Sequence, residues 1–234
     1  MSNVLAMKPV TRPEKGGGAR AAVPGAVAPV GHVVKATDGT DGRRREVAHV
    51  ERELPPGGVS AYLAARKAGA RSLVLWADPE RRNRLATLIT ESASDGVCVY
   101  RVLGAGGETI GTLVREKALS GKGLRTRWTV AQPGCPEAVG FKGRIFWWFV
   151  WWLLLPVQTA IGVGSLLSGG GDVARGPRRI IWRAGREVPL EFLSDGNEVH
   201  VHSSWVDWRL AAALAALIPT FDSWLGTPWD DKRN

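Results

Sequence analysis

Short apolar runs alternate with turn residues, about ten residues apart, over most of the second half of the chain. Segment 97–118, "VCVYRVLGAGGETIGTLVREKA", predicts two strands around a glycine-rich turn. Five further strands are predicted, in "LRTRWTVAQ" (124–132), "AVGFKGRI" (138–145), "RRIIWRAG" (178–185), "REVPLEFL" (186–193) and "EVHVHSSW" (198–205). Short strands at this spacing are typical of a closed or sandwiched antiparallel sheet.

Upstream, the pattern predicts a helix, a strand and a second helix. Segment 59–70, "VSAYLAARKAGA", has weak helical character, and "RSLVLWAD" (71–78) contains a four-residue apolar run typical of a strand. "DPERRNRLATLITE" (78–91) predicts a helix, with Asp78 as its N-cap and Pro79 at its first position. Its apolar residues recur at helical spacing, namely Leu85, Leu88 and Ile89.

Near the C-terminus, "VDWRLAAALAALIPTFDSWL" (206–225) predicts an Ala/Leu helix that begins at Asp207. The helix is apolar nearly all round, as expected of one that is enclosed by other elements. With about 13 apolar residues it is shorter than the roughly 20 that span a bilayer. We therefore expect a buried core helix.

The longest apolar stretch interrupts the predicted sheet. Residues 145–171 carry no charge, and they include four clustered tryptophans. The Leu, Ile, Val and Phe residues alone favour insertion by about 4–7 kcal/mol, which predicts a membrane segment over 145–168. The alternative is a buried pair of core helices. The predicted membrane contacts are Phe146, Trp147, Trp148, Phe149, Trp151, Trp152, Leu153, Leu154, Leu155, Ile161, Leu166 and Leu167.

Basic residues flank this stretch on both sides, and they bear on its topology. Positive charge on both flanks predicts that both face the cytoplasm, because cytoplasmic loops carry the excess of Lys and Arg. Pro156 lies near the middle of the stretch, so it favours a hairpin of two short arms over one straight span. A single span of about 40 Å remains the alternative. The residues predicted to face anionic lipid are Lys142, Arg144, Arg175, Arg178 and Arg179.

Composition and net charge predict the domain boundaries and the kind of partner. Residues 1–45 are rich in Gly, Ala, Pro and Arg without sustained apolar periodicity, which predicts a disordered tail that lacks the apolar core of a signal peptide. One β-rich domain is expected over 46–225, interrupted by 145–168, with a polar tail over 226–234. The net charge of +9 suits an acidic partner, either nucleic acid or an anionic bilayer.

Several motifs superficially suggest chemistry. "GAGGETIG" (104–111) resembles a dinucleotide-binding loop, but that loop needs a helix after it and here a strand follows, so a hairpin turn is predicted. Glu198, His200 and His202 share one strand face, but no further ligand cluster accompanies them, which favours an ordinary polar face over a metal site. Cys98 and Cys135 fit reduced thiols. No enzymatic activity, cofactor or metal is predicted.

Nucleic-acid binding requires basic residues interleaved with exposed aromatic side chains. In this chain the arginines are scattered, and the tryptophans concentrate where charge is absent. The lipid bilayer is therefore the expected partner, and no protein partner is indicated.

A spaced motif resembles a known superfamily. The pattern "Y-x-V…G-x-x-I-G-x-L…R-x-x-W-x-V" is similar to the LURP-one-related, phospholipid-scramblase and tubby C-terminal-like proteins. The resemblance covers roughly residues 97–218 and implies a 12-stranded barrel whose centre is threaded by a helix that "VDWRLAAALAALI" resembles. The matching residues are Tyr100, Val102, Gly107, Ile110, Gly111, Leu113, Trp128 and Val130.

The chain departs from that superfamily in its apolar insertion, and it lacks a cysteine-rich palmitoylation cluster and an Asp-rich calcium loop. Scramblase activity and functional residues are therefore not carried over. The predicted fold is mainly β, an antiparallel barrel-like sheet with a C-terminal apolar core helix and an inserted membrane-active helical hairpin. The predicted function is non-enzymatic binding or scaffolding at the cytoplasmic leaflet. The alternatives are a soluble lipid-binding or scramblase-like protein that sequesters the apolar segment, and a single-pass membrane protein.

Overall fold

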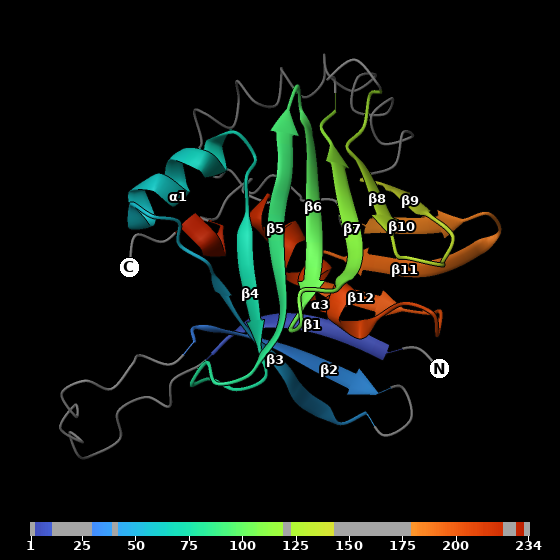
Figure 1. Cartoon of the computed structure of the whole chain (residues 1–234). Coiled ribbons are helices and arrows are strands. Elements are labelled where there is room, and N and C mark those ends of the chain that lie inside the picture. Colours follow the sequence, from blue (N-terminus) through green and yellow to red (C-terminus); the bar gives the residue numbers. More distant parts are fainter. Residues whose placement is uncertain are drawn as a thin grey trace, which may run out of the picture.

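The computed structural model describes residues 3–10, 30–38, 42–118, 123–142, 179–221 and 228–231. The described residues form twelve antiparallel strands that close into one barrel, with each strand paired to its neighbours in the sequence and β1 paired to β12 (Figure 1). The strands are β1 (Asn3–Pro9), β2 (His32–Asp38), β3 (Arg44–Arg52), β4 (Ser72–Trp76), β5 (Arg84–Ser94), β6 (Val97–Gly104), β7 (Thr109–Glu116), β8 (Arg127–Ala131), β9 (Ala138–Phe141), β10 (Arg179–Ala184), β11 (Glu187–Leu193) and β12 (Glu198–Val201).

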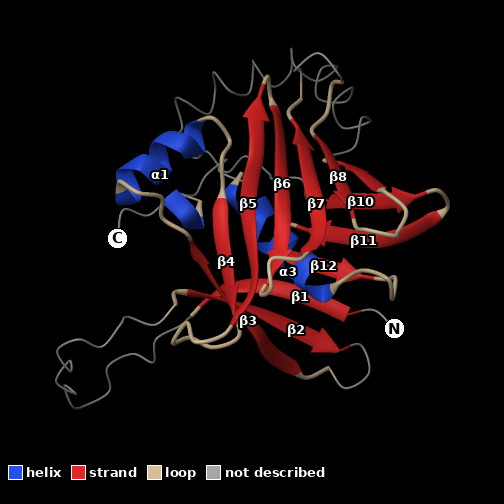
Figure 2. Cartoon of the chain, in the orientation of Figure 1, coloured by secondary structure: helices blue, strands red, loops and turns tan. Residues whose placement is uncertain are grey.

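The described residues include two helices beside the strands (Figure 2). Helix α1 (Gly58–Lys67) lies outside the barrel, and α3 (Trp208–Leu217) lies in the barrel interior. Two short 3-10 turns follow, η1 (Ile218–Thr220) directly after α3 and η2 (Trp229–Asp231) near the C-terminus. The predicted barrel-like sheet and C-terminal core helix are thus confirmed.

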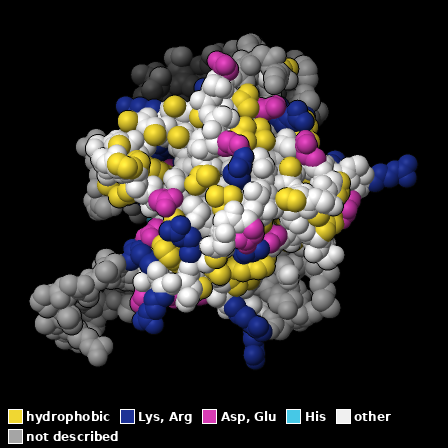
Figure 3. All heavy atoms as spheres, viewed as in Figure 1, with side chains coloured by type: hydrophobic (Ala, Val, Ile, Leu, Met, Phe, Trp, Pro, Cys, Tyr) yellow, Lys and Arg dark blue, Asp and Glu magenta, His cyan; other side chains and the backbone are white. Residues whose placement is uncertain are grey.

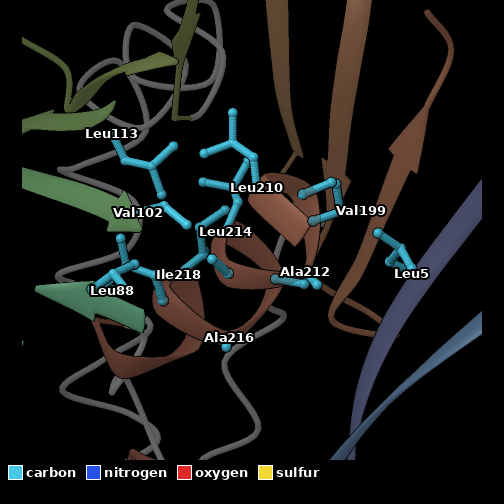
Figure 4. Packing of buried hydrophobic residues seen from close by; sticks show 14 of the residues in the cluster. Leu5, Leu88, Val102, Leu113, Val199, Leu210, Ala212, Leu214, Ala216 and Ile218 are labelled. Atoms are coloured by element: carbon cyan, nitrogen blue, oxygen red, sulfur yellow. The ribbon is translucent and has the colours of Figure 1, made fainter. Parts of the chain in front are cut away.

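The barrel core is built around α3. Every residue from Leu210 to Leu217 is fully buried, as expected for a helix that is apolar on all sides. Leu214 and Leu210 point toward β6 and β7, and Ala212 lies on the side of β1 and β12 (Figure 4). A Cβ on Gly111 of β7 would lie 2.8 Å from a Leu210 methyl group, so the missing side chain lets α3 approach the sheet.

Buried and half-exposed residues alternate along the strands, so that one face of each strand packs on the core. In β6, Cys98, Tyr100 and Val102 are buried, while the residues between them are half-exposed, which is the period of two that a one-sided sheet requires. Charges of both signs are scattered over the barrel face drawn in Figure 3. The "GAGGETIG" motif forms the β6–β7 hairpin, closed by a Gly107 N–H that donates to the Gly104 carbonyl over 3.0 Å.

The predicted helix over 78–91 is wrong. Asp78 accepts the backbone N–H groups of Arg82 and Asn83, so it caps a tight turn, and β5 begins at Arg84. β5 pairs with β4 on one side and with β6 on the other. The hydrogen bonds to these two strands, together with the β-branched residues of β5, stabilise a strand more than the apolar spacing stabilises a helix.

The expected disordered tail over 1–45 also differs from the structure. β1 and β2 lie within it, and they close the barrel by pairing with β12 and β3. Composition could not indicate this for β1, because one of its two partner strands, β12, lies near the other end of the sequence, whereas β2 pairs with β1 and, across a short connection, with β3. Residues 228–231 of the expected polar tail are likewise packed onto the barrel, with Asp230 fully buried.

Candidate functional site

The topology divides the barrel connections between two ends. Because the strands run up and down in sequence order, the connections after every odd-numbered strand lie at one end. That end carries α1 between β3 and β4, and it is called the α1 end here. β9 also ends, and β10 begins, at the α1 end.

The two strands that flank the apolar stretch are hydrogen-bonded neighbours. Trp182 of β10 faces Gly140 of β9, and Arg183 faces Val139, in an antiparallel register. A Cβ on Gly140 would come within 2.8 Å of an Ile180 methyl group and 3.1 Å of the Ile181 carbonyl, so the bare glycine permits this close pairing. Neighbouring strands lie about 4.8 Å apart, and the described residues on either side of the stretch therefore belong to adjacent strands.

Exposed apolar and basic side chains gather where β9 ends. Leu124 is 63% exposed and Phe141 is 41% exposed. The Arg125 guanidinium lies 4.6 Å from the centre of the Phe141 ring, in cation–π contact. Lys142 donates its backbone N–H to Thr126, and Arg179 at the start of β10 forms an ion pair with Glu191. These residues, namely Leu124, Arg125, Phe141, Lys142 and Arg179, are called the exit edge.

Of the residues predicted from the sequence to contact lipid, the structure describes Lys142 and Arg179, and it places both at the exit edge. The rest lie outside the described residues, namely Arg144, Phe146, Trp147, Trp148, Phe149, Trp151, Trp152, Leu153, Leu154, Leu155, Ile161, Leu166, Leu167, Arg175 and Arg178. Within the part of the chain that the structure describes, no helix has the length and apolarity needed to cross a bilayer.

A second group of polar side chains at the α1 end surrounds the carboxylate of Asp230. The Arg66 guanidinium binds it through two nitrogens, with Nε 2.8 Å from Oδ2 and Nη2 3.1 Å from Oδ1. Arg71 Nε lies 3.2 Å from Oδ2, and the Tyr62 hydroxyl donates to Oδ2 over 3.1 Å. Asp230 is fully buried and the Arg71 side chain is 3% exposed. We call Tyr62, Arg66 and Arg71 the anion socket.

Local structure explains how the socket is assembled. Tyr62 and Arg66 lie four residues apart on α1, so both point from one face of the helix. Arg71 follows the end of α1, where its guanidinium donates to the carbonyls of Arg66 and Ala70. Its other nitrogens donate to the hydroxyl and carbonyl of Thr220, just after α3. The Arg71 side chain is thus fixed by the backbone independently of Asp230.

The residues that carry Asp230, 228–231, are called the clasp. Trp229 donates its indole N–H to the Ala216 carbonyl over 3.0 Å and contacts the His32 ring at 4.8 Å. Arg52 donates to the backbone carbonyl of Asp230 over 2.9 Å. The clasp therefore joins α1, β2, β3 and the end of α3, which are far apart in the sequence.

Burial and charge shift the pKa values within the socket. Burial, followed by the charge of Asp230, raises the pKa of the Tyr62 hydroxyl far above its ordinary value, which keeps it a hydrogen-bond donor. Burial lowers the pKa of Arg71, against the attraction of Asp230. Burial alone would lower the pKa of Arg66 as well, but the hydrogen bond and charge of Asp230 raise it overall. Guanidinium groups stay charged throughout the physiological range.

A cavity of about 420 Å³ adjoins the socket, between α1 and the β4–β5 strands. Two of the side chains that line it, Tyr62 and Arg71, also contact Asp230. Its volume falls in the range of small-molecule sites. The lining residues are Glu53, Leu54, Pro55, Pro56, Tyr62, Ala65, Ala70, Arg71, Ser72, Ile89 and Thr90.

The histidine face predicted from the sequence lies elsewhere, on the outer wall. The rings of His200 and His202 are stacked at 6.2 Å, and their Nε2 atoms lie 3.6 Å from Glu198 and 3.7 Å from Glu191. Among the described residues, no group of three or more His, Cys, Asp or Glu side chains is arranged to hold a metal ion. Cys98 and Cys135 form no disulfide.

The socket and the clasp are not recognisable in the sequence, because their members come from α1, the turn after it and the C-terminal tail. Their only local signal is the acidic pair in "PWDD" within a basic chain. No protein-family model, curated protein or solved structure matches this chain significantly. The resemblance to the LURP-one-related, scramblase and tubby-like superfamily therefore stays a prediction, although a twelve-strand barrel around a helix is the architecture that it implied.

Proposed function

We propose that this protein is a membrane-attached binding or scaffolding barrel without enzymatic activity. In this proposal the apolar stretch 145–168 lies in the bilayer, and the barrel lies at the cytoplasmic leaflet with its α1 end toward the lipid. One observation carries the proposal, the pairing of β9 with β10 on either side of the stretch.

This pairing favours attachment from one side over a single span. A span that starts and ends on opposite faces of the bilayer would separate β9 from β10 and open the closed barrel. The opened barrel would expose two strand edges and the apolar surface that now packs on α3. Satisfying the backbone of one turn within the bilayer costs a few kcal/mol, which is much less.

The filled interior of the barrel bears on the alternative, a soluble protein that sequesters the stretch. Residues Leu210 to Leu217 of α3 are fully buried among inward-facing strand residues, including Tyr100, Trp128 and Trp182. A second apolar segment could enter only if α3 left. Because α3 is held at its start by the Asp207 cap and along its length by the core, displacing it would cost much of the stability of the fold.

The exit edge has the composition that a bilayer surface requires. Leu124 and Phe141 are exposed apolar side chains beside Arg125, Lys142 and Arg179. Apolar groups at this position can enter the lipid interface while the cations contact anionic headgroups, each worth about 1 kcal/mol. The edge lies at the end where the stretch leaves the barrel, so both features favour the same orientation.

Deletion of the stretch tests the attachment. Replacing residues 145–168 by a short Gly-rich bridge should give a soluble barrel with an unchanged circular dichroism spectrum, because the flanking strands already pair. The full chain should sediment with vesicles and the deletion variant should not. An unfolded deletion variant would mean that the stretch belongs to the core.

Cysteine labelling tests the topology. Single cysteines are placed at Arg127 of β8 and Arg183 of β10, in a background of Cys98→Ser and Cys135→Ser. With a membrane-impermeant thiol reagent, neither position should react in intact cells and both should react after lysis. Reaction of one position alone in intact cells contradicts both the one-sided attachment and the β8–β9–β10 pairing.

A charge reversal tests the orientation. Arg125→Glu at the exit edge should weaken binding of the full chain to phosphatidylserine vesicles by about fivefold or more at low salt, since it removes and inverts one contact. Arg186→Glu, in the exposed β10–β11 turn at the opposite end, is the matched control and should have little effect. Equal losses from the two variants would contradict the proposed orientation.

A further inference from the structure

The most unusual polar cluster among the described residues is the anion socket with its internal occupant. Two guanidinium groups and a hydroxyl converge on one fully buried carboxylate. That carboxylate comes from a segment of four described residues near the C-terminus. The question is whether the clasp is only an anchor or also occupies a binding site.

The socket is preorganised without the clasp. Arg71 is held by three backbone carbonyls and the Thr220 hydroxyl, and its guanidinium also lies 4.3 Å from the Phe221 ring centre. Arg66 donates to the Thr220 carbonyl as well as to Asp230. Donors that are already fixed bind an anion without paying for their ordering, which favours tight binding.

The clasp is separable from the barrel. It follows the last core element and takes part in none of the strand pairs that close the barrel. Its departure would remove contacts with His32, Arg52, Ala216 and the socket while leaving the strand ladders and α3 in place. Departure without replacement would leave two arginines adjacent and unpaired in a buried place, which is strongly unfavourable. The clasp can therefore leave readily only if another anion takes its place.

The charge of the site indicates which anion fits. Asp230 pairs with both Arg66 and Arg71, and Asp231 lies 3.8 Å from Arg66, so two carboxylates face two guanidinium groups. A phosphate monoester carries a charge of about −1.5 to −2 on three acceptor oxygens, so one such group can replace both carboxylates. Guanidinium forks suit phosphate oxygens as they suit carboxylates. The adjoining cavity of about 420 Å³ offers space for the group that bears the phosphate.

We propose that Tyr62, Arg66 and Arg71 form a binding site for a phosphate monoester, which the chain's own clasp occupies through Asp230 until such a ligand displaces it. The site stands independently of membrane attachment. The ligand is either a lipid with a terminal phosphate or a soluble phosphate monoester, and both present the same chemistry to the socket.

The first test uses the full chain and inorganic phosphate as the probe. Phosphate should increase hydrogen exchange in residues 228–231 and leave exchange in α3 unchanged, while sodium chloride at equal ionic strength should not. Exchange in the clasp that is identical in phosphate and chloride would overturn the proposal. This measurement needs no variant, so it holds even if the variants below fold poorly.

The second test weakens the clasp without altering the socket. Trp229→Ala removes the hydrogen bond to Ala216 and the contact with His32. The variant should bind phosphate at least tenfold more tightly than the wild-type chain, as measured by calorimetry. Adding Arg66→Gln should abolish that gain, whereas Arg101→Gln on the exposed outer wall, where Arg101 pairs with Glu91, should leave it intact. A gain that survives Arg66→Gln would show that phosphate binds elsewhere, and it would overturn the proposal.

The third test distinguishes the two sources of the phosphate. Vesicles of phosphatidic acid and of phosphatidylserine are matched in surface charge and offered to Trp229→Ala. A preference for phosphatidic acid of tenfold or more, lost with Arg66→Gln, assigns the site to a lipid. Equal binding to both vesicles, together with saturable binding of inorganic phosphate, assigns it to a soluble ligand. Loss of all vesicle binding with retained phosphate binding would contradict the membrane proposal and leave this site standing.

Discussion

The two ends of the barrel are closed in different ways. At the end where α3 begins, Asp207 caps the helix by accepting the Arg209 N–H over 2.8 Å, and Arg209 also pairs with Glu108 in the β6–β7 turn. Gln132 bridges Trp205 and Asp207. At the α1 end, closure depends on α1, Phe221 and the clasp, which meet from distant parts of the sequence.

Because of this difference, the features on which the proposed functions rest lie at one end of the barrel. The first end is closed by short hairpins, the Asp207 cap and the Arg209 ion pairs, whose charged side chains are 23–54% exposed. The α1 end holds an anion socket, an adjoining cavity and the exit of the apolar stretch. Irregular connections on a rigid scaffold are where binding residues concentrate in proteins generally.

The largest effect is expected in the core that both ends share. Leu214→Asp should cost several kcal/mol because it buries an unpaired carboxylate at a fully buried position. The melting temperature should fall by roughly 10 °C or more, at about 2–4 °C per kcal/mol. Leu124→Asp, at a position that is 63% exposed, is the control and should change it little. An unchanged melting temperature for Leu214→Asp would mean that α3 does not fill the barrel.

At the α1 end, Asp230→Ala should cost about 3 kcal/mol in urea unfolding, since it leaves Arg71 buried without its anion. Asp231→Ala should cost less than about 1 kcal/mol, because that side chain is 38% exposed and 3.8 Å from its partner. Phosphate should restore part of the loss in Asp230→Ala. Similar costs for the two aspartates would show that burial of Asp230 is not what holds the clasp.

The flanking strands of the apolar stretch can be disturbed directly. Gly140→Ala should destabilise the barrel by about 1–3 kcal/mol, since its Cβ would meet an Ile180 methyl at 2.8 Å and the Ile181 carbonyl at 3.1 Å. Gly123→Ala has open space around the added methyl and should be neutral in the same urea titration. A neutral Gly140→Ala would argue against the close β9–β10 pairing.

The smallest effect is expected at the opposite end. Asp207→Ala should cost about 1 kcal/mol through loss of the helix cap. Burial alone would raise the pKa of Asp207, but hydrogen bonds from the Arg209 side chain and N–H lower it overall. A lowered folded pKa contributes stability above the ordinary carboxyl range, and that contribution is lost as the pH falls through the folded value. The difference between wild type and variant should therefore be constant above about pH 5 and shrink below about pH 4. A difference independent of pH would rule out this charge contribution.

Much of the fold follows from local pattern. The alternation of β6, the turn after Gly104 and the uniformly apolar α3 with its Asp207 cap are each recognisable within a dozen residues. The spacing of Leu85, Leu88 and Ile89 predicts a helix at β5, but pairing with the two neighbouring strands makes this segment a strand. β1 and β2 lie in a segment rich in Gly, Ala, Pro and Arg, which predicts disorder, and only the closure of β1 on β12 with the β2–β3 hairpin makes them strands.

The sequence by itself determined a β-rich chain with one buried helix and one apolar stretch flanked by positive charge, since hydrophobic period and charge are local properties. Tertiary structure alone decided that β1 closes the barrel on β12, and that β9 pairs with β10, the strands on either side of the apolar stretch. It also decided that Asp230 meets Arg66 and Arg71 across more than 150 residues. Such contacts gain their energy from burial and pairing of distant groups, and that energy exists only once the barrel has closed.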